Sequence, residues 1–371
     1  MVSIAISFLV MIVAVSISSG FREEIRDGIS DLTGDVQLMP RDMNYVSEDS
    51  PISSNPSFLG AIDSLEGVRS ISPAIYRAGV IKKDDMIHGV LFKGVPRENA
   101  DSVTLGVLVP ERLSEMFGIK PGDKLLSYFV GERVKVRNFN VTGTYEGVMD
   151  GTDNMVVLAD ISDMRRLNGW DEGQVSDIEI SLDPDKRGME GMRSMTSLIG
   201  NMAFNMATEE DDDMVATSVV SRYPQIFEWL DVIDFNVLFI LILMTIVAGF
   251  NMVSGLLIML FRNISTIGTL KAMGMKDKVI AKVFLRVASG IALKGMLAGN
   301  VLALALCALQ GSTHLLRLNP ENYFVSFVPV SLDLPLILVA DAVSYLVIIL
   351  FLLIPCLFVS KVDPAQTVRA K

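Results

Sequence analysis

The sequence contains few of the residues that most often bind metals or cross-link a chain. Of its 371 residues, two are cysteines and two are histidines. Both cysteines, Cys307 and Cys356, lie in apolar runs, and neither His88 nor His314 has a Cys or His partner at metal-ligand spacing. The sequence therefore excludes a disulfide framework and a cysteine–histidine zinc cluster.

A phosphate-binding loop of the form GxxxxGK[ST] is also absent, so the chain does not hydrolyse ATP by that device. No spacing of carboxylates selects a catalytic pair, and we expect a protein that is not an enzyme and holds no cofactor of its own.

Basic charge is scarce in residues 21–230, which carry 21 Lys and Arg against 36 Asp and Glu, a net charge of −15. Such a domain argues against nucleic-acid binding, which needs a basic surface.

Apolar residues, in contrast, are abundant. Half of the residues are hydrophobic, only 20% are charged, and the mean hydropathy is +0.45. The apolar residues are concentrated in four blocks, each close to the roughly 20 residues that a bilayer-spanning helix needs. The predicted spans are 1–21, 235–261, 287–309 and 334–359. The expected fold class is a membrane α-helical protein with four transmembrane helices and a large extracytoplasmic α+β domain between the first two.

The first span lacks the basic flank and cleavage site of a signal peptide. The helical spacing continues beyond it, at Phe21, Ile25, Ile29 and Leu32, so we expect an uncleaved helix that projects from the membrane as a stalk. Nothing precedes this span, and we expect that an N-terminal stretch is missing. A second stalk is predicted before the second span from the helical spacing of Ile226, Phe227, Leu230 and Ile233.

The short loops predict the orientation in the membrane. The loop at 262–286 has six basic residues against one acidic residue, and the tail at 360–371 has three against one. The loop at 310–333 has one basic residue against two acidic ones. Because basic loops face the cytoplasm, both chain ends and the 262–286 loop are predicted to be cytoplasmic. Residues 22–234 then lie outside the cytoplasm, as does the 310–333 loop.

The domain at 22–234 is predicted to be α+β and to have two lobes. A hairpin is expected from strands at 125–130 and 133–145, with a bulge near Asn138, where the apolar alternation changes phase. The other predicted elements are a strand at 86–95, short helices beginning at Pro110 and after Asp160, and a strand–helix–strand unit at 177–182, 188–207 and 214–220.

Two features of this domain have more than one interpretation. The methionines at 189, 192, 195, 202 and 206 form either the core face of a helix, which their spacing favours, or an adaptable surface for acyl chains. The acidic run Glu209–Asp213 is either a solvated loop, which is the commoner case, or a surface that attracts a basic carrier protein.

The most specific motif is Arg262-Asn-Ile-Ser-Thr-Ile-Gly-Thr-Leu-Lys-Ala-Met-Gly-Met275. It resembles the segment E/R-R-T-x-x-I-G-I-L-R/K-A-L/M-G-A of ABC transporter permeases of the FtsX and MacB superfamily. The usual acidic residue at its head is absent, because Arg262 follows Phe261 directly. Further segments resemble the lipoprotein-releasing LolC/LolE branch, namely those at 106–113, 118–124, 223–231, 248–257, 320–324 and 364–369.

The resemblance implies that the chain is driven by a separate ABC ATPase dimer, which binds ATP and Mg and contacts the cytoplasmic loop. Residues 264, 267, 270 and 273 lie on one helical face, so the loop forms a short amphipathic coupling helix that needs a groove in a partner. The alternative is a helix on the lipid surface with its lysines at the headgroups. The predicted coupling residues are Arg262, Ile264, Ile267, Gly268, Leu270, Lys271, Met273 and Gly274.

The polar residues inside the predicted spans that mark candidate sites are Asn251, Lys294, Asn300 and Asp341. A charge at this depth is expensive and marks either function or a buried pair. Lys294 and Asp341 approach the midplane from opposite sides, and Lys294 alternatively reaches back to the cytoplasmic interface. The asparagines are predicted to form hydrogen bonds between helices, and Gly295 and Gly299 to permit close helix packing.

The resemblance implies ATP-driven release of triacylated lipoproteins from the inner membrane to a soluble periplasmic carrier. Movement of the coupling helices passes through the stalks to the outer domain. A second permease, either the same chain or a paralogue, completes the dimer. The acyl chains are expected in an apolar cavity between the first two spans, with Val10, Leu238 and Ile242 assigned by depth alone.

Two alternatives stay open. The first is a MacB-like envelope efflux permease, which the lack of a fused ATPase domain argues against. The second is an FtsX-like regulator of cell-wall hydrolases that transports nothing, which the large outer domain argues against.

Overall fold

The computed structural model describes residues 1–83, 86–96, 105–131, 133–145, 155–209, 211–319, 323 and 325–356. The predicted tail at 360–371, the end of the fourth predicted span at 357–359, the motif at 364–369 and most of the motif at 320–324 lie outside these residues. The chain divides into two compact units. The helical unit comprises Met1–Glu23, Glu228–Arg317 and Phe327–Lys371, and the α+β unit comprises Glu24–Phe227 and Leu318–Ser326.

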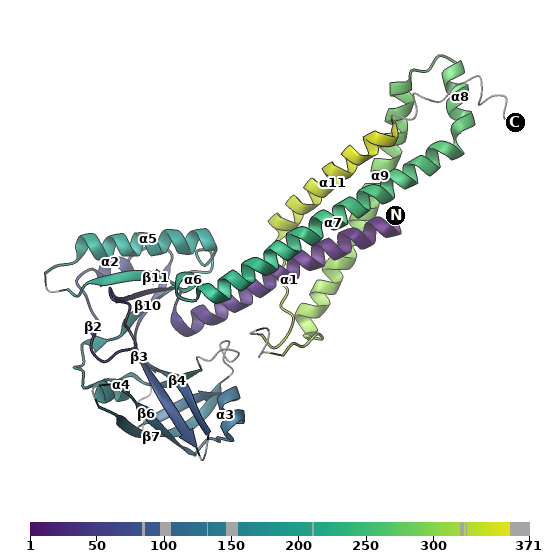
Figure 1. Ribbon diagram of the computed structural model, residues 1–371. Coiled ribbons are helices and arrows are strands. Elements are labelled where there is room, and N and C mark those ends of the chain that lie inside the picture. Colours follow the sequence, from purple (N-terminus) through teal and green to yellow (C-terminus); the bar gives the residue numbers. More distant parts are fainter. Residues whose placement is uncertain are drawn as a thin grey trace. The chain divides into compact units, whose positions relative to one another are not determined.

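Four helices are long and apolar enough to cross a membrane (Figure 1). They are α1 (Val2–Thr33), α7 (Pro224–Arg262), α9 (Asp277–Thr313) and α11 (Leu334–Cys356). The short helix α8 (Ile264–Ala272) connects α7 to α9. The helices α1 and α7 extend beyond their apolar blocks, as the two stalk patterns predict. The side of the membrane that each loop faces stays a prediction.

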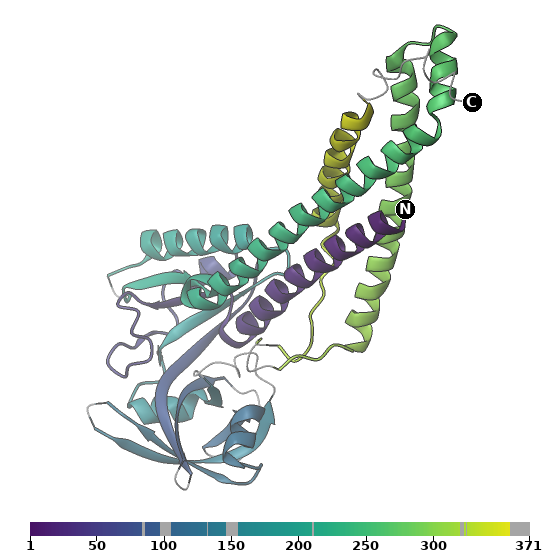
Figure 2. The ribbon, with the colours of Figure 1, turned by 45° about the vertical axis from the view of Figure 1, so that its right-hand side comes forward.

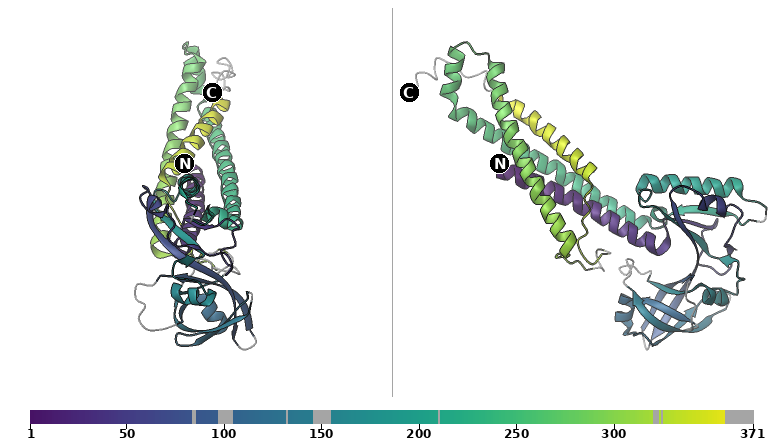
Figure 3. Two further views of the ribbon diagram at one scale, coloured as in Figure 1. Left: turned by 90° about the vertical axis from the view of Figure 1, so that its left-hand side faces the viewer. Right: turned by 180° about the vertical axis from the view of Figure 1, so that it is seen from behind.

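Helix α1 is the most buried of the four. In its apolar segment, Ile4, Phe8, Ile12 and Val15 are each less than 5% exposed. They pack against side chains from α7, α9 and α11, and Figure 3 shows α9 alongside α1. The residues that share these clusters include Ala248, Met252, Ala288, Ala292, Ala303, Ile337, Ile348 and Leu352.

The described strands of the α+β unit form a nine-stranded sheet in the order β11-β1-β10-β3-β4-β8-β5-β7-β6. Strand β3 also pairs with β6, so the strands from β3 to β6 close into a barrel. A separate small sheet joins β2 (Ile52–Ser53) to β9 (Gln174–Val175). The bounds of the nine strands are Val36–Pro40 (β1), Val68–Lys83 (β3), Met86–Val95 (β4), Gly106–Pro110 (β5), Lys124–Phe129 (β6), Lys135–Tyr145 (β7), Val156–Asp160 (β8), Asp177–Leu182 (β10) and Met214–Ser218 (β11).

The long strand β3 belongs to both lobes of this unit. Its first part pairs with β10 and its second part with β4 (Figure 2). The helix α5 (Met189–Met206) lies on β11 and β1, and α2 (Leu59–Asp63) contacts β3. In the barrel lobe, α3 (Glu111–Phe117) contacts β5 and β7, and α4 (Ile161–Asn168) contacts β4 and β8. The predicted α+β class with two lobes is confirmed, because the lobes are distinct but share one strand.

The predicted hairpin is confirmed, but its predicted bulge near Asn138 is wrong. The β6–β7 register is unbroken, and the irregularity lies instead in the β5–β7 pairing, between Val107 and Leu108. Val136 is 44% exposed and Phe139 is 1% exposed. These two residues lie on opposite faces of one regular strand, so the apparent change of phase reflects which face is buried.

The predicted strand–helix–strand unit is confirmed as β10, α5 and β11. Both strands run antiparallel to β1, which lies between them. Of the methionines on α5, Met192 and Met195 are buried in the core, whereas Met189 and Met206 are more than 40% exposed. The core interpretation therefore holds for only part of this set.

The acidic run after α5 contacts its own domain. Two backbone N–H groups donate to it, from Ser57 to Asp211 Oδ1 at 2.9 Å and from Ser53 to Asp212 Oδ2 at 2.6 Å. Asp213 pairs with Arg41 at 3.0 Å. The run is thus a surface loop, as expected, and it also holds the segment around β2.

Buried charges lie at the junction between the lobes. Lys93 Nζ is 2.7 Å from Glu179 Oε2, and the Tyr76 hydroxyl donates to Glu179 Oε1 at 2.5 Å. Arg222, in α6 (Val219–Arg222), is 3.4 Å from Asp177 Oδ2. All five side chains are less than a tenth exposed. Removing one partner of the Lys93–Glu179 pair costs about 3–5 kcal/mol, because the other charge is left buried and alone.

Asp177 gives a pH-dependent prediction. Burial raises the pKa of Asp177, and the Glu179 carboxylate adds to this, to about 8. The folded protein then binds more protons than the unfolded chain between about pH 4 and this value. The contribution of Asp177 to stability therefore falls as pH rises through that window.

We expect Asp177→Asn to flatten the dependence of the free energy of unfolding on pH between about pH 4 and pH 8. The measurement is denaturant unfolding of the full-length protein in detergent at several pH values. Asp171→Asn, an exposed position, serves as the control. An equal slope for Asp177→Asn and the unsubstituted protein would contradict the assignment.

Candidate functional site

A cluster of charged and polar side chains joins α1 to α7 in the helical unit. Arg22 Nε donates to Asp234 Oδ2 at 3.0 Å, and Arg22 Nη2 donates to Asp231 Oδ1 at 2.6 Å. The Ser18 hydroxyl also donates to Asp234. The Arg22 side chain is only 20% exposed, so water screens these ion pairs less than it would at a fully exposed site. The cluster therefore fixes α1 against α7.

A pocket of about 330 Å³ opens beside this cluster, with walls from α1, α7 and the start of α11. One part of its lining is polar: Ser18, Ser19, Arg22, Asp234 and Asp333. The other part is apolar: Val15, Val237, Leu238, Leu241, Leu336 and Ala340. A cavity with this division can take an amphipathic molecule, with an apolar chain against the aliphatic wall and a polar group near Arg22.

The three residues assigned to a substrate cavity by depth are not brought together. Leu238 lines the pocket. Ile242, one turn further along α7, is 52% exposed and Val10 is half-buried in α1, and neither lines it. Arg22 and Asp234 were not predicted as site residues from the sequence. The available signal was that Arg22 directly follows the first apolar block and Asp234 directly precedes the second.

The intramembrane acid Asp341 is paired with an amide. Asn300 Nδ2 on α9 donates to Asp341 Oδ2 on α11 at 2.5 Å, and Asp341 is 5% exposed. Lys294 is exposed, and no ion pair to it occurs within the part of the chain that the structure describes. Lys294 lies six residues before Asn300 and therefore on another face of the helix, which explains why the asparagine meets the acid.

Other polar contacts join the remaining helices. Asn251 Nδ2 on α7 donates to Ser3 Oγ on α1 at 2.6 Å. Two pairs were not expected from the sequence: Thr245 with Ser344 at 3.0 Å, and Ser289 with Tyr345 at 2.6 Å. Hydroxyl pairs of this kind have no spacing signature, so nothing in the sequence indicated them.

Gly295 and Gly299 lie where α1 crosses α9. A Cβ atom at Gly299 would be 2.5 Å from the Ala5 carbonyl oxygen, and one at Gly295 would be 2.9 Å from Ile4 Cβ. The two backbones therefore approach too closely for any larger residue, as in other small-residue helix contacts.

The expectation for the coupling helix α8 requires a correction. Ile267 is 1% exposed, Gly268 is buried and Leu270 is half-buried. They pack on residues of this same chain, including Leu260 at the end of α7 and Ile280 at the start of α9. The chain can bury this face because α9 begins at Asp277, well before its apolar segment, and so supplies the surface that the predicted loop lacked.

Apolar side chains are exposed at both ends of the α8 segment. Ile264 is 36% exposed, Met273 is 70% exposed, and Arg262 is exposed. Lys271 was predicted to contact the partner ATPase, but its side chain pairs with Asp277 of this chain at 2.9 Å.

The end of α8 is a defined turn. Gly274 has a φ of +88°, and the Met275 N–H donates to the Leu270 carbonyl at 3.0 Å. This is the Schellman arrangement that ends many helices at glycine, and it holds Met273 outward on a rigid turn.

Among the described residues, no group of three or more His, Cys, Asp or Glu side chains is placed to hold a metal ion.

Comparison with known protein families shows which class of protein this chain resembles. Residues 238–364 match the FtsX-like permease C-terminal family. This match includes α8, most of α7 and all of α9 and α11. The chain thus carries an FtsX-like permease domain, and the superfamily resemblance that its loop motif indicates is confirmed.

The most informative relatives are lipoprotein-releasing permeases. The lipoprotein-releasing system transmembrane protein LolC of Xylella fastidiosa (strain 9a5c) is 21% identical over 394 positions, which cover 99% of this chain and 92% of the relative. LolC of Neisseria meningitidis serogroup B (strain MC58) is 21% identical with the same coverage. LolE of Haemophilus influenzae (strain Rd) is 21% identical over 100% of this chain and 93% of the relative. The chain is therefore an ABC transporter permease similar to LolC and LolE.

A solved structure with detected similarity is the periplasmic region of MacB from Actinobacillus actinomycetemcomitans. It has 12% sequence identity and a TM-score of 0.32, and the alignment covers 53% of this chain and 95% of that one.

The α1–α9 contact predicts that alanine has different effects on stability at two glycines of α9. We expect Gly299→Ala to destabilise the helical unit, because the new Cβ meets a backbone oxygen that cannot move away alone. Gly290 on α9 has nothing within 4 Å of an added Cβ. Gly290→Ala should therefore be neutral or stabilise by up to about 1 kcal/mol, through helix propensity.

The measurement is the thermal midpoint of the full-length protein in mild detergent. If both variants shift the midpoint equally and in one direction, the close contact of α1 with α9 is refuted.

Proposed function

We propose that this chain is the membrane subunit of an ABC transporter that releases lipoproteins from the inner membrane to a soluble periplasmic carrier. It is a multi-pass protein whose α+β unit lies in the periplasm. ATP and Mg are bound by a separate ATPase dimer, and a second permease completes the complex. The observation that carries the proposal is the similarity to LolC over 99% of the chain, together with an amphipathic pocket at the α1–α7 contact.

The pocket supports an acylated substrate. Its apolar wall comes from α1, α7 and α11, so an acyl chain can enter from the surrounding lipid without crossing a polar barrier. Burying each methylene of such a chain contributes about 0.8 kcal/mol. The polar group of the substrate then lies near Arg22, whose two carboxylate partners outweigh its positive charge, so no net positive charge holds an anionic group there. Binding is therefore mainly apolar, which suits a substrate that must leave again.

The end of α8 supports an ATPase contact. Met273 extends from a turn fixed by Gly274, and Ile267 and Leu270 attach this turn to α7 and α9. A push on Met273 thus reaches two membrane helices directly. Of these, α7 continues to Pro224 without a break, so it can carry the displacement along its length.

The proposal is tested by reconstituting the chain in nanodiscs with its ATPase and a triacylated lipoprotein and measuring transfer to a soluble carrier. Leu238→Gln places an amide in the apolar wall and should lower the transfer severalfold, because a buried amide without partners costs about 1–3 kcal/mol. Leu243→Gln is the matched control, since Leu243 is similarly exposed on α7 but does not line the pocket.

Three results would replace the proposal. Equal transfer by both variants would remove the pocket from the substrate path. Export of a soluble peptide instead of a lipoprotein would favour a MacB-like efflux permease. Recovery of the ATPase with a cell-wall hydrolase, and without transfer of any substrate, would favour an FtsX-like regulator.

We expect Met273→Asp to weaken binding of the ATPase by about tenfold or more, because it places a charge in the centre of an apolar contact. The measurement is co-purification from membranes and the affinity of the ATPase for the reconstituted chain. Met116→Asp, on α3, makes the same change at a residue that is 40% exposed and should have no effect.

The thermal midpoint of both variants should equal that of the unsubstituted protein. Normal ATPase binding by Met273→Asp would show that the exposed end of α8 is not the contact.

A further inference from the structure

The sheet of the α+β unit has one open edge. At one end of the strand order β6 returns to β3, but at the other end β11 pairs with β1 alone. Arg41 N donates to Asp213 O, and Val219 N donates to Asp35 O. Antiparallel strands alternate the direction of their hydrogen-bonding groups, so the N–H and C=O groups of Met214 and Ala216 point away from β1.

This edge lacks the features that normally prevent pairing. Such edges are protected by charged side chains, proline, bulges or a covering segment. The five residues of β11 include no charge and no proline, and their register with β1 is regular. Within the described residues, no strand pairs with the outer side of β11. The edge is therefore able to accept another strand.

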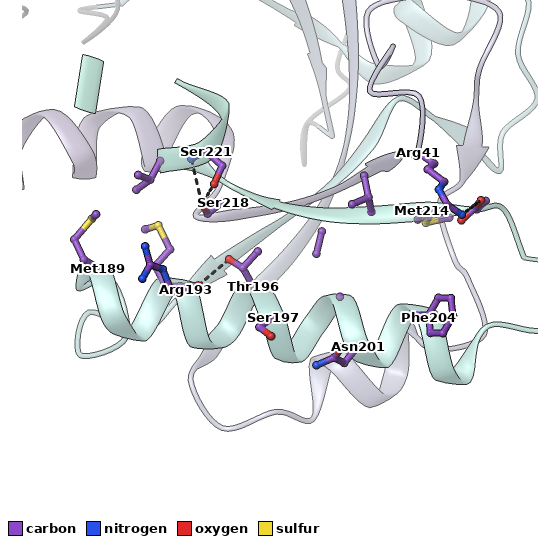
Figure 4. Close-up of a pocket in the computed structure, with 16 residues that line it drawn as sticks. Arg41, Met189, Arg193, Thr196, Ser197, Asn201, Phe204, Met214, Ser218 and Ser221 are labelled. Carbon is purple, nitrogen blue, oxygen red and sulfur yellow. Dashed lines mark hydrogen bonds and ion pairs between the residues drawn. The ribbon is translucent and has the colours of Figure 1, made fainter. Parts of the chain in front are cut away.

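A pocket of about 550 Å³ lies between β11 and α5 (Figure 4). Gly200 of α5 lies opposite Ala216, and a Cβ atom added at Gly200 would be 3.4 Å from Ala216 Cβ. Two large apolar side chains of α5 are exposed at its ends: Met189, which is 42% exposed, and Phe204, which is 82% exposed. An added strand would place side chains under α5 and cover both.

One end of the pocket is basic and the other is mainly acidic, with Arg41 also at the acidic end, where it pairs with Asp213 at 3.0 Å. Figure 4 shows Arg193 at the end of β11 that carries Ser218 and Ser221, and Phe204 at the end that carries Met214. The acidic run that ends at Asp213 directly precedes Met214. Arg193 is exposed, and no ion pair to it occurs in the described ranges.

We infer that β11 pairs antiparallel with β11 of a second copy of this chain, with the two-fold axis near Ala216. In this antiparallel pairing, the acidic run of each copy lies beyond Ser218 of the partner copy, on the side where the partner copy carries Arg193. Each copy therefore contributes both charges, and the same surface is complementary to itself, as a two-fold interface requires. The two sheets become continuous, and the two α5 helices lie on the same face.

This inference deepens the proposed function, which requires two permease chains, by naming the partner as a second copy and giving its contact. It does not depend on what is transported. An extended segment of another protein would meet the same free backbone groups, but the match between Arg193 and the acidic run favours the copy.

The test is disulfide cross-linking of the full-length chain in membranes, co-expressed with its ATPase. In a Cys307→Ser, Cys356→Ser background, Ala216→Cys should form a dimer of twice the chain mass on oxidation. Directly opposite, hydrogen-bonded residues have Cα atoms about 5.5 Å apart, which a disulfide can span. Val136→Cys, exposed on β7, is the matched control and should stay monomeric.

The charge match is tested in the same assay. Arg193→Glu should lower cross-linking at position 216 by about two- to fivefold, the range expected for exposed ion pairs. Glu209→Lys added to it should restore the yield, because Glu209 is an exposed acid of the run that makes none of the contacts of Asp211, Asp212 and Asp213. If Ala216→Cys does not accumulate, co-expression of Met214→Cys copies with Ser218→Cys copies tests the same pairing.

A cross-link to a chain of different mass would overturn the inference in favour of another partner. So would a yield no greater than that of Val136→Cys. If the chain still co-purifies with its ATPase in that case, the proposed function stands and only the β11 contact is refuted.

Discussion

The antiparallel pairing of β1 with β11 is the contact that joins the beginning of the α+β unit to its end. Strand β1 directly follows α1, and β11 leads through α6 into α7. Val36 lies opposite Ser218, and Val219 N donates to Asp35 O at 3.0 Å. The buried Asp35 also accepts from Leu182 N at 2.7 Å. Two helix ends that are distant in sequence are thereby held by one pair of strands.

The same two helices are held together in the helical unit, by different chemistry. There the contact is the ion pair of Arg22 with Asp231 and Asp234. The pocket beside it and the glycine face of α9 both use α1 as a wall, so one helix takes part in the ion pair, the pocket and the close helix contact.

The sequence predicted what periodicity and composition encode, and it failed where the answer depended on contacts between distant segments. The four apolar helices, the hairpin and the β10–α5–β11 unit follow from apolar spacing and turn residues. The bulge near Asn138 was predicted wrongly because spacing alone cannot distinguish a bulge from a regular strand with one exposed face. Ile267 was expected to face a partner because Lys278, Lys282 and Arg286 interrupt the apolar run, so the first turns of α9 were assigned to the loop. The Arg22 cluster required knowledge that α1 and α7 are neighbours.

The position of β1 between β10 and β11 also determines when the α+β unit can form during synthesis. β1 emerges from the ribosome directly after α1, but both of its partner strands are made much later. Until then β1 has two unpaired edges. Contacts of such long sequence separation slow folding and expose strands to wrong pairing. The interval between the synthesis of β1 and that of β10 and β11 is therefore the stage at which β1 is most open to pairing with the wrong strand.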